Sequence, residues 1–147
     1  MRLIRGWLKG GRPMLERTHI QSTGFRNIGP EGARTGFELR IRQANYRSSR
    51  LSLIEGVDIT VDGVLYPAAH NRFRLGDREY TRSELNEATE TRLYVGDYFT
   101  VVVPKAGGLT RGVHLVGSAI SYRHPYFPPE FQPAIARNER HATIILS

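Results

Sequence analysis

YRSSRLSLIEGVDITVDG, residues 46–63, is the most informative segment of this chain. It begins as a polar loop, continues through a short apolar run over 51–54, and ends with apolar residues at every second position over 57–61. Asp62-Gly63 follows as a two-residue turn, because both residue types tolerate the positive φ that fits the twist of paired strands. The segment therefore predicts a β-hairpin, and it contains no cluster of side chains suited to catalysis.

The same alternation recurs along most of the chain. Apolar side chains occupy every second position over 37–41, which is typical of a strand with one buried and one solvated face. Over 99–103 the intervening positions are also partly apolar, so we expect that strand to be covered on both faces. Further strands are expected over 73–75, 113–122 and 142–146.

Short turns and one helix signal complete the pattern. The Gly-Asp pairs at 76–77 and 96–97 each separate two expected strands, as short loops do in antiparallel sheets. Thr81 and Glu84 have the spacing of a capping box, in which each side chain accepts a hydrogen bond from the other residue's backbone N–H. These signals predict an all-β fold, an antiparallel β-sandwich with one short helix.

The chain of 147 residues is expected to form one domain. Residues 1–13 contain four basic residues, three glycines and no acidic residue, and are predicted to be a flexible basic extension. Residues 14–147 then form the β-sandwich domain, with an arm rich in proline and aromatic residues at 122–133. The sequence has no cysteine, and it has no apolar run near the roughly 20 residues that a membrane-spanning helix needs. We therefore expect a cytoplasmic protein that contacts no membrane.

Arginine dominates the charge of the chain. The net charge is +7, and 19 of the 21 basic residues are arginines. Nucleic-acid binders often have such a balance, because cationic side chains neutralise phosphates. Here, however, the arginines are scattered singly among acidic residues, which favours arginine on strand surfaces and at protein interfaces. No nucleic-acid partner is expected.

The sequence offers few residues for chemistry, and we predict neither a catalytic nor a metal-binding residue on this chain. The five histidines lack the close spacing that places two metal ligands on one strand or helix. His114 is expected to point outward from its strand. Glu55 follows an apolar run and could act as an acid or base. Pairing of Glu55 with a backbone N–H or an arginine is the interpretation that we favour.

Aromatic and arginine residues gather in two irregular segments. The arm at 122–133 contains four prolines, which exclude it from a central strand and favour an extended backbone. Each of its rings could fold back onto the domain's own sheet, but the whole arm has the composition of a protein interface. The loop at 45–50 has a similar composition. The residues predicted to contact a partner are Tyr46, Arg47, Arg50, Tyr122, Tyr126, Phe127 and Phe131.

Several hairpin and loop signals, in their order and spacing, carry a resemblance to a known family. The motifs are Arg42…Tyr46-Arg47, Leu51-Ser52-Leu53-Ile54-Glu55, Val61-Asp62-Gly63, Phe73…Gly76…Tyr80-Thr81…Glu84-Leu85, Gly107-Gly108-Leu109…Gly112-Val113-His114 and Ser121-Tyr122. With these motifs the chain resembles, over roughly residues 25–126, the beta subunit of bacterial C-glycoside deglycosidases.

The resemblance implies a small β-sandwich subunit that binds a larger alpha subunit with a TIM-barrel fold. The larger subunit would carry the catalytic base and a divalent metal, expected to be manganese, and this chain would hold no cofactor. The substrate would be a 3-oxo-C-glycoside, such as that of a flavonoid. Its keto group acidifies the neighbouring C–H, and removal of that proton allows the aromatic aglycone to leave with cleavage of the C–C bond. The metal would stabilise the enolate, and no catalytic residue of the family maps onto this chain by motif.

A free-standing carbohydrate-binding β-sandwich is the alternative function. Such a module presents a row of exposed aromatic rings on one sheet face. The candidates for this row are Tyr94, Tyr98 and Tyr122.

Overall fold

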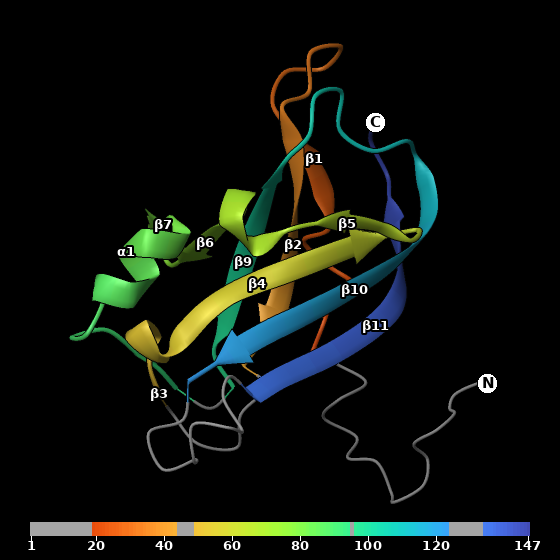
Figure 1. The fold of residues 1–147 in the computed structure, drawn as a ribbon. Helices are drawn as coiled ribbons and strands as arrows, with labels where there is room; N and C mark the ends of the chain where they lie inside the picture. Colours follow the sequence, from red (N-terminus) through yellow and green to blue (C-terminus); the bar gives the residue numbers. More distant parts are fainter. Residues whose placement is uncertain (1–18, 44–48, 95, 124–133) are drawn as a thin grey trace, which may run out of the picture.

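The computed structural model describes residues 19–43, 49–94, 96–123 and 134–147. Two antiparallel sheets lie face to face, one in front of the other in Figure 1, which confirms the predicted all-β fold. The front sheet has the order β11 (Ala134–Ile144), β10 (Gly112–Tyr122), β4 (Ile54–Val61) and β5 (Val64–Tyr66). The rear sheet has the order β1 (Arg26–Ile28), β2 (Gly36–Arg42), β9 (Tyr98–Pro104), β6 (Arg72–Leu75) and β7 (Arg78–Tyr80).

Alternate residues of both sheets meet between the layers and form the core. Leu39 on β2 and Ile59 on β4 are fully buried, as the period-two pattern predicts. Aromatic rings contribute to this core, and the Phe73 and Phe99 rings stack with centroids 4.4 Å apart. The buried apolar side chains thus form one continuous cluster that spans both sheets.

The predicted hairpin is confirmed. Val61 and Val64 are paired, and the turn between them places Asp62 at φ 51° and Gly63 at φ 86°. Left-handed backbone at both positions is the geometry that a two-residue hairpin requires. The strand begins earlier than expected, at Ile54, after a single 3-10 turn over Leu51–Leu53.

The two Gly-Asp pairs have different roles. The pair at 76–77 joins β6 to β7, with Leu75 opposite Arg78, as predicted. The pair at 96–97 does not join two paired strands. The strand before it, β8 (Arg92–Leu93), pairs with the distant β3 (Ser49–Arg50) and makes a separate two-stranded ladder.

The capping box at Thr81 is present and begins helix α1 (Arg82–Glu87). The Glu84 backbone N–H donates to Thr81 Oγ1 at 3.2 Å, and the Thr81 N–H donates to Glu84 Oε1 at 2.8 Å. Leu85 is the buried residue of this helix, which packs against β4 beside a second 3-10 turn at Ala68–His70 (Figure 1). Within the described segments, no helix is long and apolar enough to cross a membrane.

Two strand predictions need correction. The last strand was expected over 142–146, but β11 spans Ala134–Ile144, because its polar half also pairs with β10. The expectation that β9 is covered on both faces is wrong, since Tyr98 is exposed and Thr100 is only half-buried. The opposing sheet covers β9 from one side alone. Residues 1–13 and 124–133 lie outside the described residues.

Candidate interaction surface

Gln43 connects three elements at one end of the sandwich. Its backbone N–H donates to Asp97 O at 2.7 Å, and its side-chain Nε2 donates to Leu93 O at 3.4 Å. Its Oε1 accepts a hydrogen bond of 3.1 Å from the Tyr122 hydroxyl. One buried amide therefore fixes the ends of β2, β8 and β10 relative to one another. We call this part of the molecule the loop end and define it by Gln43, Leu93, Tyr122 and the residues that adjoin them.

Tyr122 was predicted to contact a partner, and the structure shows that this is wrong. The residue is 2% exposed and belongs to the core. It is the last residue of β10, opposite Ile54, at a point where the register of the ladder shifts. Gln43 satisfies the hydroxyl, so the ring can be buried completely without leaving a polar group unpaired.

Arg50 is exposed at the loop end, as a contact residue must be. It lies on β3, opposite Arg92 of β8, and both residues are exposed. Like charges that lie directly opposite in a ladder generally oppose strand pairing. The short ladder thus brings two guanidinium-bearing residues to the same part of the surface.

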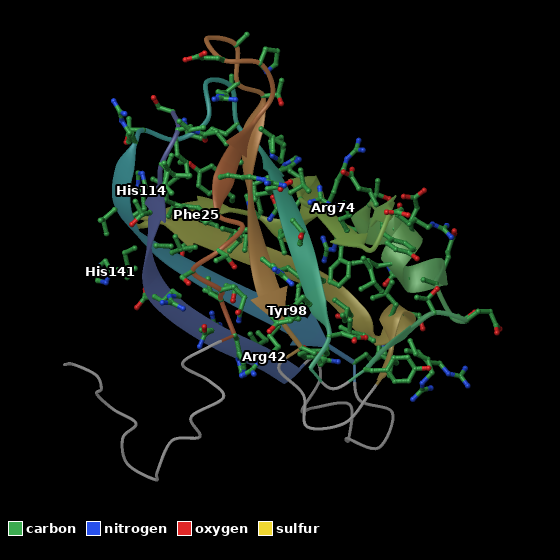
Figure 2. The ribbon with its side chains drawn as sticks, turned by 180° about the vertical axis from the view of Figure 1, so that it is seen from behind. Phe25, Arg42, Arg74, Tyr98, His114 and His141 are labelled. Atoms are coloured by element: carbon green, nitrogen blue, oxygen red, sulfur yellow. The ribbon has the colours of Figure 1, made fainter. Side chains whose placement is uncertain are left out.

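Two tyrosines that were not predicted as contacts complete this surface. Tyr94 is 57% exposed and Tyr98 is 42% exposed. The turn between them is closed by hydrogen bonds in both directions between Tyr94 and Asp97. The Arg40 guanidinium lies 4.1 Å from the centre of the Tyr98 ring and supports it from β2. Figure 2 shows Arg42 and Tyr98 near this end of the rear sheet.

Glu55 confirms the interpretation favoured from the sequence. Its Oε2 lies 2.8 Å from Nη2 and 2.9 Å from Nε of Arg123, an ion pair on the surface. The Arg123 backbone N–H also donates to Leu53 O at 2.8 Å. Arg123 is therefore held at the loop end, and Glu55 has an arginine partner rather than an acid–base role.

Five of the seven predicted contact residues lie outside the described residues. They are Tyr46, Arg47, Tyr126, Phe127 and Phe131. Described residues next to both segments, Gln43 and Ser49 in one case and Arg123 in the other, lie at the loop end. The two predicted contact segments therefore join the sandwich at the same place, which the sequence alone did not show.

A buried carboxylate on the rear sheet was missed. Glu38 is 3% exposed and lies 2.8 Å from Arg26 Nε and 3.0 Å from Arg74 Nη1. Burial alone would raise the pKa of Glu38, but the hydrogen bonds from Arg74 and Arg26 outweigh it and lower the pKa below its usual value. The network fixes the outer surface of this sheet and is structural in character.

His114 was expected to point outward, and this expectation is wrong. The residue is 7% exposed, with Nδ1 2.6 Å from Asp62 Oδ2 and Nε2 2.7 Å from Thr110 O. Both partners are hydrogen-bond acceptors, so this geometry favours the form of the imidazole in which both ring nitrogens carry a proton. Burial alone would lower the pKa of His114, but the hydrogen bonds to Thr110 and Asp62 raise it overall.

The other histidines that the structure describes do not assemble into a metal site. His19 is buried, and burial followed by the nearby Arg42 lowers the pKa of its imidazole. His70 and His141 are exposed on different elements, and His124 lies outside the described residues. Among the residues that the structure describes, no three His, Asp or Glu side chains lie close enough to hold a metal ion.

Comparison with known proteins places these features in a family. The family described as C-glycoside deglycosidase beta subunit matches residues 15–126. A protein of Eubacterium cellulosolvens named C-glycoside deglycosidase beta subunit is 30% identical, over 82% of this chain and 83% of the relative. A Microbacterium protein named 3'-dehydrocarminate deglycosidase beta subunit is 35% identical, over 67% of this chain and 74% of the relative.

A third relative covers a shorter part of the chain. The C-glycoside deglycosidase beta subunit of Arthrobacter globiformis is 38% identical, over 47% of this chain and 52% of its own length. The family match covers most of the sandwich, from the residues before β1 to the end of β10. The chain therefore belongs to the C-glycoside deglycosidase beta subunit family.

Proposed function

We propose that this chain is the small, non-catalytic subunit of a heteromeric C-glycoside deglycosidase. The observation that carries the proposal is the family match over residues 15–126, together with relatives that are named as beta subunits. A beta subunit implies an alpha subunit, and we propose a larger partner with a TIM-barrel fold. The complex would act in the cytoplasm, which stays a prediction.

The loop end is the surface that we propose for binding the larger subunit. Arginine and tyrosine are the residue types enriched at the centres of protein interfaces. Arg50, Tyr94 and Tyr98 supply both types on backbone that is fixed by strands or a closed turn. The buried Gln43 network holds these elements together, so the surface is formed before a partner arrives.

We assign the chemistry to the larger subunit. The proposed reaction is elimination from a 3-oxo-C-glycoside, in which removal of the proton next to the keto group allows the aglycone to leave with cleavage of the C–C bond. The divalent metal implied by the resemblance is also assigned to the larger subunit. The His, Asp and Glu side chains of the described residues do not fit such an ion, because no three of them come together.

A free-standing carbohydrate-binding module is the weaker alternative. It requires a planar row of exposed rings, and Tyr122 is in the core instead. Tyr94 and Tyr98 remain exposed, but Tyr94 lies in the turn before β9 and Tyr98 on the strand itself. Two rings on different local structures provide a smaller platform than such modules use.

Co-expression with the larger subunit of the same organism tests the proposal. We expect the two chains to co-purify and only the pair to cleave a 3-oxo-C-glycoside. Full activity of the larger chain alone would contradict an essential role for this one. A chain that does not co-purify but retains an oligosaccharide on an affinity column would favour the binding module.

A further inference from the structure

The four edge strands of the two sheets differ greatly in length. β1, β5 and β7 have three residues each, whereas β11 has eleven. Natural proteins usually protect sheet edges by keeping edge strands short, by placing charged side chains on them, or by placing proline or a bulge in them, because open backbone groups invite pairing with another chain. Three of the edges are short, whereas β11 is long and carries charged side chains.

β11 also lacks the usual interruptions. It contains neither proline nor glycine, and all eleven of its residues pair with β10 without a shift in register. In an antiparallel strand, alternate residues direct their backbone N–H and C=O groups to opposite sides. Within the described residues β11 forms a ladder with β10 alone, so one side of it presents a long row of donors and acceptors (Figure 1).

The described segment that lies nearest to β11 does not pair with its backbone. The Ile20 N–H donates to the side-chain Oδ1 of Asn138 at 3.2 Å, and Arg140 Nη1 donates to Ile20 O at 3.0 Å. Both contacts use side chains at the even-numbered positions of β11, which from 136 onward form its half-buried or buried inner row. They close the side of the sandwich and leave the open backbone groups of β11 without a described backbone partner.

The outer row of β11 has a self-complementary arrangement of charge. Arg137 and Glu139 are both exposed and lie on either side of Asn138. If a second copy of β11 runs antiparallel, with Asn138 at the two-fold axis, each Arg137 lies opposite Glu139 of the second copy. The same register places His141 opposite the exposed Ile135 of the second copy. Opposite charges that face each other across a ladder stabilise pairing, and a symmetric dimer forms each such pair twice.

We propose that β11 pairs with β11 of a second copy of this chain, so that two four-stranded sheets join into one continuous sheet. The inference is independent of the proposed enzymatic function. The expected partner strand is β11 of a second copy, because the charges of Arg137 and Glu139 on either side of Asn138 are complementary to the same residues of another β11. In a heteromeric enzyme this contact would join two small subunits.

Charge exchange on the full-length chain tests the proposal. Light scattering and sedimentation at submillimolar concentration should give twice the monomer mass of 16.7 kDa for the wild-type chain. Arg137→Glu and Glu139→Arg each convert two attractive pairs into two repulsive ones, so each should raise the dissociation constant at least about tenfold. The double variant Arg137→Glu/Glu139→Arg restores opposite charges in this register and should recover the dimer.

Matched controls carry the same charge changes elsewhere. Arg111→Glu and Glu87→Arg alter exposed residues outside β11 and should leave the measured mass unchanged. Circular dichroism of every variant separates loss of pairing from loss of folding. A wild-type chain that stays monomeric would overturn the proposal, and so would a dimer that is insensitive to the single variants. Failure of the double variant to recover the dimer would exclude this register and the pairing of Arg137 with Glu139 of the second copy.

Discussion

Asp62 and His114 form a short hydrogen bond of 2.6 Å that connects the tip of the β4–β5 hairpin to β10. Asp62 also accepts from the Leu115 backbone N–H at 2.8 Å, so one carboxylate serves both the turn and the neighbouring strand. The hydrogen bond from His114, followed by that from Leu115, lowers the pKa of Asp62. The hairpin on which the sequence-based fold prediction rests is thus secured by a histidine 52 residues away.

The stability that the His114–Asp62 hydrogen bond contributes to the fold should fall as pH rises above 6.5, whereas His19, whose pKa is lowered by burial, makes the fold more stable as pH rises towards 6.5. A histidine whose pKa is raised in the folded state stabilises that state fully below its unfolded value of 6.5, and this contribution is lost as pH rises through the folded value. His141 and Tyr66 are the other titratable groups that interact with Asp62. Urea unfolding at pH 5.5 and 8.5, with an NMR titration of His114, measures the effect.

Asp62→Asn provides the control for this pH dependence. The amide removes the charge that favours the protonated imidazole, so the loss of stability between the two pH values should become smaller. Asp62 itself contributes stability above its usual pKa, and this contribution is lost as pH falls through its lowered value. His70→Gln changes an exposed histidine and should leave the pH profile unaltered. An unchanged profile in Asp62→Asn would contradict the assignment.

Replacing Glu38 with glutamine should destabilise the fold by about 2 kcal/mol, because it removes a buried carboxylate that pairs with Arg26 and Arg74. Glu79→Gln is the matched control on the same sheet, since Glu79 also pairs with arginines but is exposed. Its cost should stay below about 0.5 kcal/mol. Denaturant unfolding at neutral pH distinguishes the two, and equal costs would show that burial of Glu38 has no energetic role.

Tyr122→Phe should cost about 1 kcal/mol of folding free energy, because it removes the buried hydrogen bond from the Tyr122 hydroxyl to Gln43 Oε1. The ring stays in the core, so affinity for the larger subunit should not change. Unfolding and binding measured on the same preparation test both statements. A large loss of affinity for the larger subunit with unchanged stability would show that Tyr122 contacts that subunit.

Arg50→Glu should weaken binding to the larger subunit without lowering stability, the reverse of the effect expected for Tyr122→Phe. Arg50 is exposed, so stability should change by less than about 0.5 kcal/mol. Binding to the larger subunit should weaken at least about tenfold, which corresponds to about 1.4 kcal/mol. Arg111→Glu makes the same charge change just before β10 begins, at the end away from Tyr122, and should bind normally. Calorimetric titration of the larger subunit with both variants decides whether the loop end is the contact.

Thr81→Ala should cost about 1 kcal/mol, since it removes the acceptor of the Glu84 N–H at the start of α1. Thr89→Ala changes an exposed threonine after the same helix and should be close to neutral. Thermal unfolding of the pair measures the difference. Equal melting temperatures would indicate that packing of Leu85 alone holds the helix.

Local signals in the sequence predicted the parts of the fold that local interactions determine. The turn at Asp62-Gly63 and the capping box at Thr81 depend on neighbouring residues, and both are confirmed. The errors concern contacts that are distant in sequence. His114 is buried because Asp62 supplies an acceptor, and Tyr122 is buried because Gln43 does. No spacing rule within either strand indicates these partners.

The candidate surface was predictable in composition but not in arrangement. Arg50 could be predicted as a contact residue, because arginine in an irregular, aromatic-rich segment is typical of protein interfaces. The sequence indicates Tyr94 and Tyr98 only as candidates for a sugar-binding row, because the pairing of β8 with β3 is not visible in it. Because of that pairing the turn at 96–97 does not close a hairpin, and Tyr94 directly follows Leu93, which pairs with Ser49, the neighbour of Arg50.

The buried amide of Gln43 has a kinetic consequence. Because it ties three chain segments together before any encounter, the described part of the loop end needs no reordering when another protein arrives. Association would then be limited by diffusion and orientation, with rate constants of about 10⁵ to 10⁷ M⁻¹s⁻¹. Differences in affinity among variants would arise mainly from how long each complex lasts.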